Sequence, residues 1–175
     1  MNPNGTRFIA TTSLMLALAV LLPIGIHVIN PLFARVLLPM HLPVLLAGML
    51  VGPGSGVLVG LLAPGLSALI TGMPPAYAIP LMTVELPVYG LVAGVLYQRF
   101  RWNIYAALLL AMVFGRVVFV FALLVLAGFM ALPYTAAEYV TGGVLAASLP
   151  GVVLQLVVVP IIVTAVKRKS ARSRW

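Results

Sequence analysis

The sequence predicts an all-α integral membrane bundle of six transmembrane helices. Hydrophobic residues make up 63% of the 175 residues, charged residues only 7%, and the mean hydropathy is +1.23. A typical soluble domain is about 45–50% apolar and about 25% charged, and a folded chain of this size still exposes much of its surface. Since this composition cannot cover a surface that faces water, lipid is the expected solvent. Residues 1–175 are expected to form a single membrane domain, because no linker divides them.

Six apolar runs justify the helix count. Spanning helices need about 17–25 mostly apolar residues. Runs near this length cover Phe8–Ile29, Met40–Val51, Val57–Ile70, Ile79–Tyr97, Ile104–Leu126 and Val144–Val166. Turn residues separate the runs, as in the loop 30–39, the Gly-Pro-Gly of 52–54 and the Pro-Pro of 74–75. The second run is short for a full span, so we expect it to be tilted or partly re-entrant.

The basic residues predict that both termini are cytoplasmic. Of the ten Lys and Arg residues, five lie in a basic cytoplasmic tail, 167–175. With six spans, Arg7, Arg99 and Arg101 join them on the inner side and Arg35 lies on the outer side. This asymmetry follows the positive-inside rule. The formal net charge of +8 therefore indicates membrane topology and contact with anionic lipid, and not nucleic-acid binding.

Glu85 and Arg116 are the charged residues that fall inside predicted spans. Ionisable groups in hydrocarbon are costly, and each is a candidate for function. At about 1.5 Å per residue, both lie about 10 Å from the outer face of a hydrocarbon core about 30 Å thick. We therefore expect them to share one depth, where they either form a structural ion pair or also face a solute.

Further polar residues are predicted in the same outer half. Asn30 ends the first helix, His41 opens the second, Tyr77 precedes the fourth, and Tyr89 lies one turn after Glu85. Singly, a histidine or tyrosine at this level is usually an amphipathic residue at the headgroups. Their position around one mouth, together with the charged pair, makes these six residues the predicted substrate-binding set.

Small residues line two helices. Gly90 and Gly94 lie on the side of the fourth helix away from Glu85, where they would let another helix approach closely. On the first helix, Ala10, Ser13 and Ala17 fall on one narrow face at about 100° per residue. That face either packs inside the bundle or serves as a docking surface for another membrane protein.

Several kinds of chemistry are excluded by composition. The chain has no cysteine and only two acidic residues, which excludes thiolate metal sites and makes paired carboxylates improbable. No Walker, HExxH or GxSxG motif occurs, and the two histidines lie on different elements. We therefore expect no catalytic residue, no metal site, no cofactor and no enzyme activity in this chain. Any ATP hydrolysis would belong to partners.

Four segments resemble the substrate-binding S components of energy-coupling factor (ECF) vitamin transporters. They read ALAVLLPIGIHV, LPMHLPVLLAGMLVGP, GLLAPGLSALITGMPP and ELPVYGLVAGVLYQRFRWNIYAALLLAMVFGRVVF, and the similarity covers about Ser13–Phe119. The resemblance implies the binding subunit of an ECF-type ABC transporter, which captures a small water-soluble vitamin or precursor at the extracellular side for ATP-driven uptake. It also implies a membrane coupling (T) subunit, two ATPase subunits and a bacterial or archaeal cell membrane.

The resemblance also bears on individual residues. It implies that the first helix docks on the coupling subunit through an Ala-x-x-x-Ala face, which reads Ser13 and Ala17 here. The metal-transporting branch of the family begins Met-His, whereas this chain begins Met1-Asn2, so no metal solute is expected. In the vitamin branch the ligand lies near the outer face, where the polar set is predicted.

Two other interpretations stay open at this point. The chain could be a small proton- or ion-coupled carrier in which Glu85 takes up and releases the proton. It could also be a non-transporting membrane scaffold, in which Glu85 and Arg116 only pair with each other. The sequence does not identify the solute.

Overall fold

The computed structural model describes residues 3–30, 37–129 and 148–172, and every regular element in these ranges is helical. The elements are α1 (Pro3–Ile29), α3 (His41–Leu46), the π-helix η1 (Ala47–Val51), α4 (Pro53–Thr71), α5 (Ala78–Gly94), the π-helix η2 (Val95–Arg99), α6 (Ile104–Leu126) and α9 (Leu149–Arg172). Five helical segments are long and apolar enough to cross a membrane. The predicted all-helical membrane bundle is confirmed.

The observed helix bounds follow the apolar runs closely, with two informative differences. α4 begins at Pro53, four residues before the predicted Val57, because Gly52 adopts a φ of 145° that ends η1 and proline is favoured in the first turn of a helix. α9 continues to Arg172, so residues 167–172 of the predicted tail extend the last span as helix. The predicted start of this span at Val144 lies outside the described residues.

The short second run forms the α3–η1 segment, His41–Val51. Its 11 residues rise only about 16 Å at about 1.5 Å per residue, too little to cross the hydrocarbon. Most of its side chains are nevertheless buried, with Val44, Leu45 and Met49 fully so. The segment is therefore a central packing element of the bundle.

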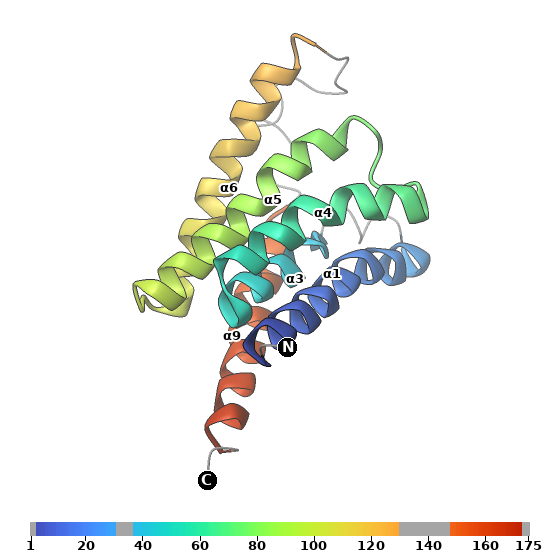
Figure 1. The fold of residues 1–175 in the computed structure, drawn as a ribbon. Coiled ribbons are helices and arrows are strands. Elements are labelled where there is room, and N and C mark those ends of the chain that lie inside the picture. Colours follow the sequence, from blue (N-terminus) through green and yellow to red (C-terminus); the bar gives the residue numbers. More distant parts are fainter. Residues whose placement is uncertain (1–2, 31–36, 130–147, 173–175) are drawn as a thin grey trace.

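Successive segments run in alternating directions (Figure 1), which brings the described N- and C-terminal ends to the same end of the bundle as the α5–α6 connection. A cation–π contact ties this end together, with Lys167 Nζ 4.0 Å from the centroid of the Tyr97 ring. Arg99 and Arg101 lie in the same connection. Apart from Arg116, the basic residues that the structure describes are thus gathered at one end, and their cytoplasmic location stays a prediction.

A glycine interface joins η1, α4 and α5. It consists of Gly48, Gly56, Gly60, Gly90 and Gly94, and a Cβ added at any of them would lie within 2.2–2.7 Å of backbone atoms on the facing element. Backbones this close leave room only for hydrogen at Cα, which is the packing that small residues allow between membrane helices. The predicted packing role of Gly90 and Gly94 is confirmed. α4 and α5 form the most extensively packed pair of helices described.

The apolar core lies where α3, α5, α6 and α9 meet. Its buried members include Leu45, Leu86, Tyr89, Ala111 and Val159, from all four of these helices. Nearer the opposite end from the basic residues, α3, α5 and α9 carry the buried polar side chains His41, Glu85 and Gln155. There α5 and α6 also form a second, smaller apolar cluster.

Candidate functional site

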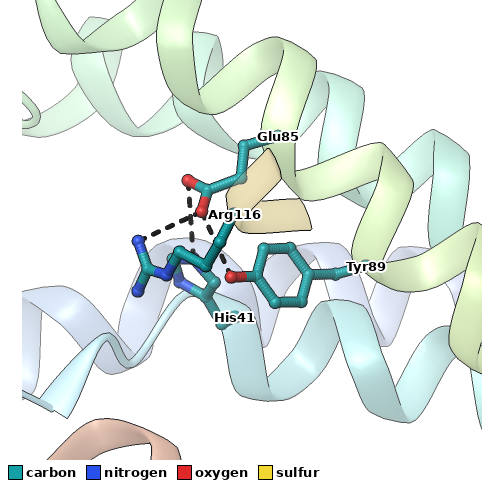
Figure 2. A network of polar contacts seen from close by, with 4 residues as sticks. All are labelled: His41, Glu85, Tyr89 and Arg116. Carbon is teal, nitrogen blue, oxygen red and sulfur yellow. Dashed lines mark hydrogen bonds and ion pairs between the residues drawn. The ribbon is translucent and has the colours of Figure 1, made fainter. Parts of the chain in front are cut away.

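The site is built around the carboxylate of Glu85, in the middle of α5 (Figure 2). The Glu85 side chain is only 2% exposed. Tyr89 lies one helical turn further along α5, and its hydroxyl donates a hydrogen bond of 3.2 Å to Glu85 Oε1. The spacing of four residues places both side chains on one helix face, so α5 alone provides a carboxylate and a phenol at one position.

Two other helices supply the remaining partners of this carboxylate. Arg116 of α6 places Nη1 3.2 Å from Glu85 Oε1, and His41 at the start of α3 places Nε2 3.8 Å from Glu85 Oε2. The His41 ring also meets the Tyr89 ring edge-on, with 5.0 Å between the ring centroids and an interplanar angle of 84°. The structure therefore brings together four of the six predicted residues from three helices. We refer to His41, Glu85, Tyr89 and Arg116 as the Glu85 network.

Gly115 positions the tyrosine of this network and was missed by sequence reasoning. A Cβ at Gly115 would lie 2.4 Å from Tyr89 Cε2, so any larger residue would displace the ring. Its signal in the sequence was a glycine directly before the charged residue in an otherwise apolar helix. Together with Gly90 on the far side of α5, it lets α5 lie closely between its neighbours.

The electrostatics of the network are balanced but incompletely hydrogen-bonded. Glu85 and Arg116 carry opposite charges in a setting where an isolated charge is very unfavourable. By contrast, neither Nδ1 nor Nε2 of the buried His41 ring has a hydrogen-bond partner in the described part of the chain. Buried polar atoms are normally satisfied, so this imidazole is available to a further polar group.

The remaining two residues of the predicted set lie at helix ends. Asn30 directly follows α1, and Tyr77 directly precedes α5. Both lie at the end of the bundle opposite the basic residues, as predicted, but neither belongs to the network drawn in Figure 2. Their part in binding a solute stays a prediction.

The predicted docking face on α1 is exposed. Ala10, Ser13 and Ala17 all face away from the bundle, whereas Ala19 and Val20 of the same helix are buried. α1 packs on α4 through a different side, where the Thr12 and Ser55 hydroxyls lie 2.8 Å apart. Of the two interpretations of the small-residue face, internal packing is therefore wrong for these residues. The face is open to a partner or to lipid.

The described residues show what this site can do chemically. They contain no group of three or more His, Cys, Asp or Glu side chains that could hold a metal ion. Within these same ranges, Glu85 is the single acidic residue, and its two oxygens face Tyr89, Arg116 and His41. The arrangement provides charge, hydrogen-bond donors and an aromatic edge, which suits recognition of a small polar molecule.

The helices and the Glu85 network define a class: a multi-pass membrane protein with a buried polar site inside its bundle. The family model described as "ECF transporter, substrate-specific component" matches residues 7–163. The chain belongs to this family, and it is a substrate-specific subunit of a transporter and not an enzyme. This membership agrees with the resemblance and argues against a non-transporting scaffold. Comparisons with curated proteins and with solved structures returned no match.

Proposed function

We propose that this chain is the S component that captures a small water-soluble vitamin or vitamin precursor at the extracellular side of a bacterial or archaeal membrane. The observation that carries the proposal is the Glu85 network, a buried cluster of polar side chains in a family of substrate-specific transport subunits. The network lies away from the basic end of the bundle, which the positive-inside rule assigns to the cytoplasm. A solute bound there is reached from outside.

Uptake from this site needs energy that the chain does not supply, because its sequence contains no nucleotide-binding motif. In the proposed assembly a membrane coupling (T) subunit and two ATPase subunits provide it. The family supports such partners. The exposed face of Ala10, Ser13 and Ala17 supports α1 as the docking surface, since small side chains let a facing helix approach closely.

Solute capture is tested by binding to the purified full-length chain in detergent. The probes are riboflavin, biotin, pantothenate, nicotinate and pyridoxine, measured by thermal shift and by calorimetry. We expect one probe to raise the melting temperature, and His41→Leu to weaken its binding about 3- to 10-fold, the worth of one hydrogen bond. Lys167→Ala, at the basic end, is the control and should leave the Kd unchanged. Failure of every probe to bind would contradict vitamin capture.

Docking is tested by co-purification of the tagged chain with a coupling subunit and ATPases expressed from the same host. Ala17→Trp fills the exposed face of α1 with a bulky ring and is expected to abolish co-purification, because the facing helix can no longer approach. Ile29→Trp, at an exposed position of α1 about 120° around the helix from Ala17, is the matched control. Solute binding should survive both changes. Equal recovery of the partners with the two variants would place the docking surface elsewhere.

A further inference from the structure

Gln155 of α9 is a second buried polar side chain without its full set of partners. It is 1% exposed, and its Nε2 finds no hydrogen-bond partner in the part of the chain that the structure describes. An amide donor that is buried in an apolar setting without a hydrogen bond is unfavourable. In the described part of the chain, Nε2 therefore makes no bond to a neighbouring helix.

The position of Gln155 relates it to the Glu85 network. Gly151, Gln155, Val159 and Val163 recur every four residues and are all buried, so they form one face of α9. α9 packs on α3 and on α6, the two helices that carry His41 and Arg116. In Figure 2, α9 (salmon) enters the view on the side of Arg116 and His41.

The place of Gln155 along α9 corresponds to that of His41 along α3. Val159 of α9 and Leu45 of α3 belong to the same apolar core cluster, and the two helices run in the same direction in the alternating bundle (Figure 1). Gln155 lies one turn before Val159, and His41 lies one turn before Leu45. On both helices, therefore, a buried polar residue lies one turn closer to the outer end than a residue of the shared core cluster.

A second glutamine shows what a structural amide does in this protein. Gln98 of η2 donates from Nε2 to the carbonyl oxygen of Met49 at 3.0 Å, and so joins η2 to η1. Gln155 is more deeply buried than Gln98 and has no equivalent bond from Nε2. A packing role explains Gln98, whereas the amide donor of Gln155 remains unexplained by the fold.

The charges of the network restrict what these polar groups can receive. Glu85 and Arg116 already neutralise each other at 3.2 Å. A carboxylate or phosphate inserted here would bring a second negative charge to this ion pair, and it would compete with Glu85 for Arg116. An uncharged group with hydrogen-bond acceptors adds no charge and accepts from the amide of Gln155 and from the His41 ring.

We infer that Gln155 is a specificity-determining residue that, with His41, receives an uncharged acceptor group of the solute, such as a ring carbonyl or ring nitrogen. This inference rests on the proposed function and deepens it. A charged group of the solute, where there is one, then lies toward the mouth and away from the Glu85–Arg116 pair. The amide recognises the end of the molecule that enters the bundle first.

The test uses the purified full-length chain and matched pairs of probes that differ in charge: nicotinamide and nicotinate, riboflavin and its 5′-phosphate, and biotin amide and biotin. In the pair that binds, we expect the neutral member to bind at least as tightly as the charged one. A charged member that binds more than 10-fold more tightly would overturn the inference, although vitamin capture would stand. Absence of binding by all six overturns the proposed function itself.

Variants separate a recognition role of Gln155 from a packing role. Gln155→Leu is expected to weaken binding of the neutral probe about 3- to 10-fold without lowering the melting temperature of the unliganded protein, because it removes an unsatisfied donor. Gln98→Leu, the matched control, should lower that melting temperature and leave the Kd unchanged. Gln155→Met is a second variant of similar length. An unchanged Kd in both Gln155 variants, or a loss of folding in both, would overturn the inference.

Discussion

Replacing Arg116 with methionine is expected to destabilise the bundle by about 3–5 kcal/mol, because it leaves a buried carboxylate without its counter-charge. The Glu85 side chain is 2% exposed, and the arginine Nη1 lies 3.2 Å from its Oε1. Methionine keeps much of the arginine stem but none of its charge. The expected result is a large fall in the melting temperature of the purified protein, or a loss of the folded species on size-exclusion chromatography.

The double variant Glu85→Gln, Arg116→Met is the control for this prediction. It removes both charges, and replacing a buried ion pair by uncharged groups is often neutral for stability. We therefore expect the double variant to recover most of the stability that Arg116→Met loses. If the Glu85 network binds the solute, the double variant should still bind it more weakly than the unmodified chain does. Equal melting temperatures for the single and the double variant would show that the pair contributes little to the fold.

Replacing Gly90 with alanine is expected to destabilise the protein by about 3 kcal/mol, the upper range for overpacking a well-packed interior. The added Cβ would lie 2.5 Å from the backbone carbon of Gly56, and a backbone on the facing helix cannot move aside as a side chain can. The glycine interface would have to open along α4 and α5. The measurement is the melting temperature in detergent together with the yield of folded protein.

Gly65→Ala is the matched control on the facing helix. Nothing lies within 4 Å of a Cβ at Gly65, so this change meets open space and gains the helix preference of alanine over glycine, about 1 kcal/mol. The change from glycine to alanine is thus expected to lower the stability of the protein at Gly90 and to raise it at Gly65. A Gly90→Ala variant as stable as Gly65→Ala would mean that the helices separate without penalty.

Much of the fold was predictable because hydrophobic length is a direct signal in a membrane protein. α6 spans Ile104–Leu126 as predicted, since its apolar run is continuous and Asn103 caps its first turn by accepting a hydrogen bond from the Tyr105 amide. The extension of α9 to Arg172 was not predicted. Hydropathy detects where lipid ends, whereas Lys, Arg and Ala continue a helix into water equally well.

The charged part of the site was predictable because ionisable residues are rare inside membrane-spanning segments. Depth along α5 and α6 was enough to predict that Glu85 meets Arg116, because an unpaired charge there is excluded energetically. The approach of His41 depends on where α3 begins relative to α5, which no local pattern encodes. Gln155 was not predicted as a binding residue, since the absence of a partner for its amide Nε2 is a property of the packed bundle and not of the sequence.

The short connection between the charged helices has a consequence for how the protein enters the membrane during synthesis. Glu85 and Arg116 lie on consecutive helices, α5–η2 and α6, joined by residues 100–103. Inserting either charge alone at the centre of a spanning helix is unfavourable by about 2.5–3.5 kcal/mol. A helical hairpin delivers both charges together, already neutralised, before the last described helix, α9, is synthesised. The carboxylate that later holds the site together thus first serves to bring an arginine into lipid.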